Sequence, residues 1–297
     1  MESIERLQKQ LESLGELHTI VRTMKALSGA NIRQYEEAAR ALAGYYRNVE
    51  RGLHVVLREM RHPSLATRHA RGRRHLAAIV FGSDHGLCGR FNEEITRYAL
   101  ERMQSAAADP DNRRLLAVGA RVAASLEHEG EAVEEDFLVP GSAEQITATV
   151  QQILLKVDEW REASGVHYVF LFYNRHSGGG LYTPTGIELF PLNLQRFHRL
   201  EEERWPSRSL PTYSMDSERL LSRLLHQYLF VTIFRACAES QASEHASRLA
   251  AMQSAERNLD DRIREVTTHY RRARQDVITA ELLDVVSGFE TITQEGE

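Results

Sequence analysis

The fold of this 297-residue chain is decided by residues 212–287, which read TYSMDSERLLSRLLHQYLFVTIFRACAESQASEHASRLAAMQSAERNLDDRIREVTTHYRRARQDVITAELLDVVS. The stretch contains neither glycine nor proline, and all seven prolines of the chain lie between Pro63 and Pro211. Because these residue types are the main helix breakers, the stretch predicts one very long helix or two closely joined helices. Such a helix would extend roughly 110 Å at about 1.5 Å per residue. It must therefore project, pair with another long helix, or enter a partner.

The composition is that of a soluble protein from a reducing compartment. Hydrophobic residues make up 42% of the chain and charged residues 27%, which is enough to form a core and a solvated surface. The net charge of −5 gives no indication of nucleic-acid binding. Two distant cysteines, Cys88 and Cys237, do not make a disulfide framework. No apolar run approaches the ~20 residues that cross a bilayer, so we expect a cytosolic or peripheral membrane protein.

Residues 1–60 predict a first long helix. Its apolar residues begin with the three-four spacing of a coiled-coil seam, at Ile4, Leu7, Leu11 and Leu14. Continued strictly, the seam reaches His18, Val21 and Lys25, of which two are polar. A shift by one residue gives a more apolar set, Leu17, Ile20, Met24 and Leu27. We therefore expect a stutter at this point, with the seam passing to the shifted set.

Residues 75–200 change period and predict an α/β domain. Short apolar runs at 76–82, 114–120, 132–139, 166–174 and 181–192 are typical of strands. Helical patterns at 91–107, 120–128 and 143–163 separate them. Alternation of this kind favours a largely parallel, Rossmann-like sheet. The connector before it, 61–75, carries five Arg and three His, and we interpret it as a solvated linker rather than an anion-binding patch.

The C-terminal helix, placed at 212–289, carries a seam of its own. Its members are Leu249, Met252, Leu259, Ile263, Val266, Tyr270, Ala273 and Val277. Only Glu256 interrupts the series, and charged residues flank it, as a two-stranded coiled coil requires. We therefore predict a mixed α+β and α/β fold. In it, the helices of 1–60 and 212–289 form a long antiparallel coiled coil, with the α/β domain inserted between them.

One loop carries candidate chemistry. The segment SDHGLCG (83–89) follows a predicted strand and places Asp84, His85 and Cys88 close together. A Cys-dependent hydrolase or transferase would use Cys88 as the nucleophile and His85 as its base. The favoured interpretation is a tight glycine-rich turn with a buried thiol. Neither a dinucleotide fingerprint nor a P-loop is present, and the histidines lack zinc-site spacing. We expect no cofactor and no metal.

Three separated motifs resemble those of one family, the gamma subunit of rotary F-type ATP synthases. The segment Ser83–Gly89 with Phe91-Asn92 resembles the family's SDRGLCGG-[FL]-N. Its SExxSRxxAMxxAxxN segment is matched by Ser243, Glu244, Ser247, Arg248, Ala251, Met252, Ala255 and Asn258. The C-terminal signature is matched by Tyr270, Ala273, Arg274, Gln275, Ile278, Thr279, Glu281, Ser287 and Gly288. Besides these three motifs, Ile20, Met24 and Arg33 fall where the family has ITKAMxMVAASKxR.

The resemblance implies a non-catalytic rotor shaft that binds no nucleotide. It implies one copy per complex, with alpha and beta subunits around the shaft and the epsilon subunit and membrane c-ring at its foot. The expected location is the cytoplasmic side of a bacterial inner membrane, as a peripheral protein. Residues that match the family's contacts with the alpha/beta ring are Met24, Lys25, Asp84, His85, Cys88, Arg248, Gln275, Thr279 and Glu281.

The sequence also departs from the family pattern. His85 stands where Arg or Lys is usual, Arg90 replaces a glycine, Asn31 replaces a lysine and Phe289 an alanine. These departures suggest a divergent branch, such as a bacterial second-operon form. Two alternatives to the shaft remain open on the residues alone, a Cys88-dependent enzyme and a non-rotary coiled-coil adaptor.

Overall fold

The structure is a computed structural model that describes residues 4–59, 75–106, 112–163, 165–178, 181–192 and 211–294. The chain forms two compact units. Unit 1 combines Met1–Leu27 with Leu249–Glu297, and unit 2 is Ser28–Arg248. Apart from His75, the basic connector predicted at 61–75 lies outside the described residues.

Three helices account for the two ends of the chain. Helix α1 spans Ile4–Ala41 and α2 spans Ala43–Glu59, where one helical block was predicted over 1–60. Helix α7 runs without interruption over Ser217–Gln294, which is 78 residues, so of the two predicted alternatives the structure has the single long helix. Asp216 stands just before α7, and its carboxylate accepts a hydrogen bond from the backbone N–H of Arg219 at 3.3 Å. The helix begins five residues after the predicted start at 212 and continues past the predicted end at 289.

Unit 2 is built on a five-stranded sheet of order β3-β2-β1-β4-β5. Strands β1 (Leu76–Phe81), β2 (Arg113–Val118), β3 (Val133–Phe137) and β4 (Tyr168–Gly178) are parallel. Strand β5 (Leu181–Phe190) pairs antiparallel with β4. The largely parallel sheet between two long helices is as predicted, and the interspersed helices are α3 (Phe91–Ser105), α4 (Ala120–His128) and α5 (Ile146–Ala163).

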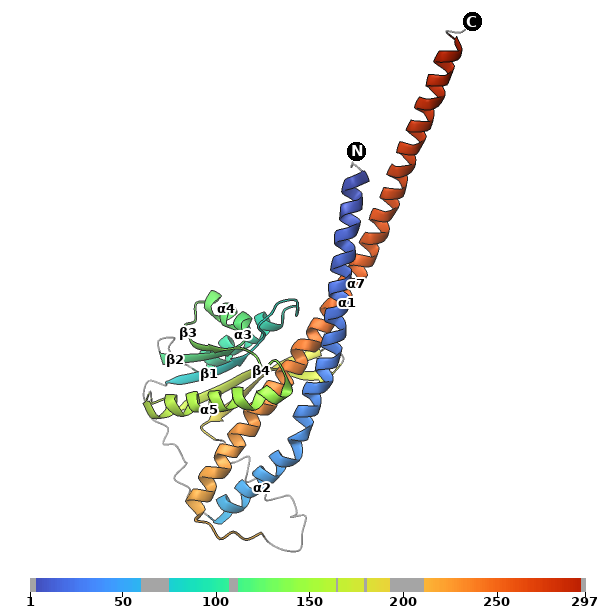
Figure 1. The fold of residues 1–297 in the computed structure, drawn as a ribbon. Helices are drawn as coiled ribbons and strands as arrows, with labels where there is room; N and C mark the ends of the chain where they lie inside the picture. Colours follow the sequence, from blue (N-terminus) through green and yellow to red (C-terminus); the bar gives the residue numbers. More distant parts are fainter. Residues whose placement is uncertain are drawn as a thin grey trace. The chain divides into compact units, whose positions relative to one another are not determined.

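Both faces of the sheet are covered, which explains why β1 is apolar at every position. Ile79 points to a cluster that contains Trp160 of α5 and Ile233 of α7. Its neighbour Val80 points to the opposite cluster, which contains Ile95 of α3 and residues of α4. Because side chains alternate along a strand, a centrally placed parallel strand needs apolar residues on both faces. Figure 1 shows α5 and α7 on one side of the sheet and α3 and α4 on the other.

Within unit 1, α1 and α7 run in opposite directions and lie side by side (Figure 1). The predicted stutter in α1 is wrong. Leu17, Ile20 and Leu27 of the shifted set are 50%, 54% and 60% exposed, whereas the strict positions His18, Val21 and Lys25 are half-buried.

The polar residues on the inward face of α1 have partners on α7. Lys25 contacts the carboxylate of Glu256, the residue that interrupts the apolar series of α7. His18 Nε2 lies 3.2 Å from Asp260 Oδ1. The polar seam positions of one helix therefore have acidic partners on the other.

Val266 offers a test of the seam in unit 1, since it is only 3% exposed. We predict that Val266→Asp lowers the free energy of unfolding by about 3 kcal/mol, because it buries a carboxylate without a partner. Urea unfolding followed by circular dichroism measures the change. The exposed neighbour Thr268, changed to Asp, serves as the control and should leave the curve nearly unchanged. Equal effects of the two substitutions would contradict the burial of this face.

Candidate functional site

The loop that follows β1 lies at the point where the strand order of the sheet reverses. From β1 the chain proceeds to β2 and β3 on one side, and β4 then pairs with the other side of β1. Ligands of such sheets commonly bind at this crevice, beyond the carboxyl ends of the strands. Here the position is taken by helix α7 of the same chain. Ser243 Oγ donates a hydrogen bond to the carbonyl of Asn174 in β4 at 2.9 Å, and Ser247 Oγ donates to the carbonyl of Cys88 at 2.5 Å.

Close backbone packing requires glycine at two positions, one just before the loop and one just before α4. A Cβ at Gly82 would lie 2.3 Å from Cβ of Val122. Gly119 has φ of +124°, and a Cβ there would lie 2.8 Å from the backbone of Ser83. Any side chain at either position would force β1 and the start of α4 apart.

Side chains of the loop then fix its shape. Asn92 accepts a hydrogen bond from the Ser83 N–H at 3.0 Å and donates one to Ser83 Oγ at 2.8 Å. Asp84 uses both carboxylate oxygens, accepting from the N–H of Ala120 and from the N–H of Val139, each at 3.0 Å. One aspartate thus joins the loop to the N-terminus of α4, where a negative charge is favoured, and to the segment after β3.

Cys88 is placed as a structural thiol. Its side chain is 2% exposed, and burial raises the pKa of the thiol. The closest polar atoms are Ser83 Oγ at 3.6 Å, the backbone carbonyl of His85 at 3.7 Å and Asn92 Nδ2 at 3.8 Å. The base expected of a Cys-dependent enzyme would be the imidazole of His85, but the contact is to its carbonyl. A buried thiol with a raised pKa is a poor nucleophile, so the site gives the enzyme alternative no support.

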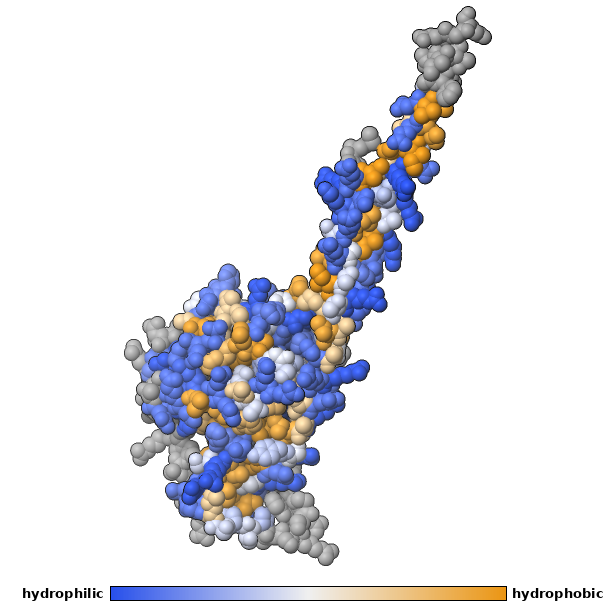
Figure 2. Space-filling model, in the orientation of Figure 1, coloured by the Kyte–Doolittle hydropathy of each residue, from blue (hydrophilic) through white to orange (hydrophobic). Residues whose placement is uncertain are grey.

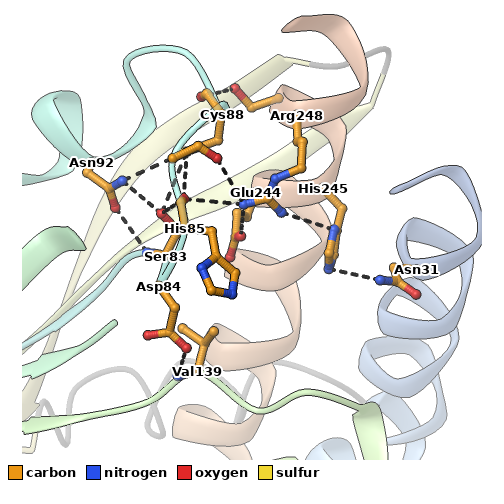
Figure 3. Close-up of polar contacts among 12 residues, drawn as sticks. Asn31, Ser83, Asp84, His85, Cys88, Asn92, Val139, Glu244, His245 and Arg248 are labelled. Atoms are coloured by element: carbon orange, nitrogen blue, oxygen red, sulfur yellow. Dashed lines mark hydrogen bonds and ion pairs between the residues drawn. The ribbon is translucent and has the colours of Figure 1, made fainter. Parts of the chain in front are cut away.

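Arg248 of α7 connects the loop to the helices (Figure 3). Its side chain is 8% exposed. One terminal nitrogen donates to Glu244 Oε1 at 2.6 Å and reaches the carbonyls of His85 at 3.3 Å and Gly86 at 3.4 Å. The other lies 3.4 Å from Nδ1 of His245. A guanidinium that is nearly buried therefore satisfies two carbonyls of a loop that is 160 residues away in sequence.

The network extends to α1 through His245. Its Nε2 lies 3.4 Å from the amide of Asn31, and its ring stacks on Tyr35 at 5.6 Å between centroids. Because a guanidinium only donates, Nδ1 must accept, and the neutral ring carries its proton on Nε2. The structure places Nδ2 of Asn31 at this nitrogen, so the amide must turn by about 180° for its carbonyl oxygen to accept the bond. Tyr35 OH donates to the carbonyl of Pro140 at 2.8 Å, which anchors this part of α1 to the segment after β3.

The two ionisable neighbours of Arg248 have shifted pKa values. Burial raises the pKa of Glu244 to about 6, against the lowering effect of Arg248. Burial, and secondly the charge of Arg248, lowers the pKa of His245 to about 4. Burial disfavours the charged form of each group, so the acid is raised and the base is lowered.

The predicted contact residues fall into two groups. In unit 2, Asp84, His85, Cys88 and Arg248 come together at the loop, with only the side chain of His85 exposed. In unit 1, Met24 and Lys25 are half-buried on α1, whereas Gln275, Thr279 and Glu281 are exposed on α7. His245 was not singled out from the sequence, and Tyr35 falls in the apolar series of α1 without any sign of its polar contact. The partners of both residues are joined to them only by the tertiary fold.

Comparisons with known proteins match nearly the whole chain. A family model described as ATP synthase (ATP-synt) covers residues 3–292. A protein named ATP synthase gamma chain from Caulobacter sp. (strain K31) is 30% identical, over 98% of this chain and 100% of that protein. This chain belongs to the ATP synthase gamma family. Another gamma chain, from Pelotomaculum thermopropionicum, is 28% identical over 97% of this chain and 98% of its own length.

Solved structures of ATP synthases contain chains with a fold similar to that of this chain. A chain of the Euglena gracilis mitochondrial ATP synthase in rotational state 3 has a TM-score of 0.62, with 18% identity over 99% of this chain and 96% of that one. A chain of the Tetrahymena thermophila central stalk and c-ring structure has a TM-score of 0.55, with 19% identity over 80% of this chain and 99% of that one. Among the described residues, no group of side chains could hold a metal ion and no helix is long and apolar enough to span a bilayer.

We predict that His245 and Glu244 have opposite effects on the pH dependence of the free energy of unfolding. His245 is held neutral in the folded state. Its contribution to the free energy of unfolding is therefore complete above pH 6.5 and falls by up to about 3 kcal/mol as the pH drops towards 4. Glu244 acts in the opposite direction, because the folded state takes up its proton first as the pH falls from about 6. His245→Phe, which keeps a ring beside Tyr35, should reduce the loss of stability between pH 6.5 and 4. Glu244→Gln should make that loss steeper.

Urea denaturation at half-unit pH steps measures both slopes. Because all other titrating groups are shared, the difference between variant and parent isolates each residue. Parallel curves for parent and His245→Phe would contradict a neutral, buried imidazole.

A further prediction concerns Arg248 and uses Cys88 as a reporter. Arg248→Met removes charge-assisted bonds to the loop, so the Cys88 thiol should react with a thiol reagent about tenfold faster or more. Cys237 is fully buried and gives an internal control that stays slow. Arg223→Met, at an exposed position of the same helix, should change neither rate. Unchanged labelling of Cys88 in Arg248→Met would show that the loop does not depend on the guanidinium.

Proposed function

We propose that this chain is the central rotor shaft of an F-type ATP synthase. It would couple ion-driven rotation of the membrane c-ring to conformational cycling of the alpha/beta ring, and so to ATP synthesis or hydrolysis. The observation that carries the proposal is the uninterrupted α7 of 78 residues, in a chain that matches the gamma family almost throughout. A helix without a break transmits torsion along its length, whereas a kink would absorb it. The chain itself is a non-catalytic subunit.

The shaft, in this proposal, is an antiparallel two-helix coiled coil of α1 and α7. Support comes from unit 1, where the buried and half-buried positions of both helices follow a three-four spacing. On α7 they run from Leu249 and Met252 through Glu256 and Leu259 to Ile263. The opposite directions of the two helices and their cross-helix ion pairs agree with this arrangement.

The C-terminal part of α7 is the proposed contact with the alpha and beta subunits. Six large apolar side chains are 44–61% exposed there, at Val277, Ile278, Leu282, Leu283, Val285 and Val286. Figure 2 shows apolar residues gathered along this part of the helix. An exposed apolar face of this extent is typical of a protein–protein interface. The predicted contacts Gln275, Thr279 and Glu281 lie on the same segment, and each is exposed.

The other predicted contacts would act at the loop and on α1. His85 is exposed, while Asp84, Cys88 and Arg248 are engaged within the chain, so we propose that these three act by holding the loop in place. Met24 and Lys25 remain proposed contacts with the beta subunits. By family likeness, the epsilon subunit and the c-ring would bind the sheet-bearing unit. The proposed location is peripheral, on the cytoplasmic side of a bacterial inner membrane.

Reconstitution tests the proposal. The purified chain alone should hydrolyse no ATP, and it should join alpha and beta subunits from the same source into an active complex. Leu282→Glu with Leu283→Glu should weaken this association at least about tenfold, because two apolar contacts would be replaced by charges. Thr268→Glu, at an exposed position of α7 outside the apolar segment, is the matched control. A chain that fails to join the hexamer, or that binds it equally well with both glutamates, would overturn the proposal.

A further inference from the structure

Helix α1 carries two faces in unit 1 that could each have packed against α7. One follows the strict spacing and contains His18, Val21 and Lys25. The other is displaced by one residue and contains Leu17, Ile20, Met24 and Leu27. A displacement of one residue corresponds to a rotation of the helix by about 100°. Up to Leu14 the first face is the apolar one, but between residues 17 and 27 burial of apolar area alone favours the second face.

The structure has the more polar face inward. Val21 and the stem of Lys25 are half-buried, and the Lys25 side chain is 32% exposed. Leu17, Ile20 and Leu27 point away and are 50%, 54% and 60% exposed. Leu7 of the inward face is 4% exposed, so apolar burial accounts for the choice of face near the N-terminus. It does not account for the choice between residues 17 and 27, where another interaction must oppose it.

The charges of the two helices are arranged to supply that interaction. Both basic seam residues are on α1 and both acidic partners are on α7, in the pairs Lys25–Glu256 and His18–Asp260. The Glu256 side chain is only 21% exposed. Turning α1 by one residue would remove Lys25 from Glu256 and leave an acidic group half-buried among aliphatic side chains. An unpaired charge in such a place is costly.

We propose that the Lys25–Glu256 and His18–Asp260 pairs select which face of α1 meets α7, and thereby keep Leu17, Ile20 and Leu27 outward. Polar residues at seam positions specify the alignment of paired helices at some expense of stability. The pairs act here as such a specifying element. The outward apolar stripe is thus a consequence of the ion pairs and not of a shortage of apolar residues for the seam.

Helix continuity is a second cause that would place the same face of α1 inward, and it must be distinguished from the ion pairs. The strict series of α1 continues to Ser28 and Tyr35, which are 2% and 1% exposed within unit 2. Continuity of the helix could by itself carry the same face into unit 1. The experiment therefore removes the ion pairs and leaves Ser28 and Tyr35 in place.

Thiol labelling of the full chain reports which face is inward. A reporter is placed on the outward face by Ile20→Cys or on the inward face by Val21→Cys, and the native Cys88 and Cys237 remain buried. In the parent background the reporter at position 20 should react faster than that at position 21. In K25M/E256M, and more so with His18→Leu added, the ratio of the two rates should fall about tenfold or invert. Circular dichroism verifies that each variant keeps its helices.

Two further variants sharpen the result. The exchanged pair K25E/E256K should restore the parent ratio, because the attraction is rebuilt with its sign reversed. Removal of the exposed pair Arg264–Asp261, by R264M/D261N, should leave the ratio unchanged, since both partners lie on α7. A ratio that stays at the parent value in K25M/E256M with His18→Leu would overturn the proposal and assign the choice of face to helix continuity.

Discussion

The structure depends on covering the apolar faces of one 78-residue helix. A helix satisfies its own backbone hydrogen bonds, but its apolar side chains must be removed from water by something else. For α7 the cover changes along its length. In unit 2 the sheet, α5 and Tyr35 of α1 bury it, so Ile233 and Cys237 are fully enclosed. In unit 1 the described residues that cover it belong to α1, and the buried positions narrow to a seam. From Val277 to Val286 the large apolar side chains are exposed.

The second constraint is the packing of α7 against the loop after β1. At the crevice where related sheets hold a ligand, this chain inserts its own helix, so the polar groups that could bind a small molecule are used internally. Asp84, Ser247 and Arg248 each satisfy backbone groups of a segment distant in sequence. The loop is therefore held by hydrogen bonds from within the chain. A loop held in this way suits a subunit that transmits force and leaves the reaction to its partners.

Charge has different roles in the two units. Arg248 is nearly buried and fully bonded, and its neighbours Glu244 and His245 have pKa values displaced by burial. These groups cannot change protonation without a change in folding free energy. Lys25 and Glu256 are partly exposed, so salt and solvent weaken their attraction. The first network holds elements together, whereas the second, in our proposal, selects the face of α1 that meets α7.

The sequence by itself determined the long uninterrupted helix, the largely parallel sheet between two helical ends, and the family. Each rests on local signals: the absence of Gly and Pro, the change of period near residue 76, and three motifs in order. Only the tertiary structure decided the face of α1, because apolar spacing favoured Leu17 and Ile20 and could not reveal that Lys25 meets Glu256 across 231 residues of chain. The same holds for the links from Arg248 to the loop and from His245 to Asn31. Periodicity reports which residues share a face of one element, but the partner of a buried charge is set by the folding of distant segments together.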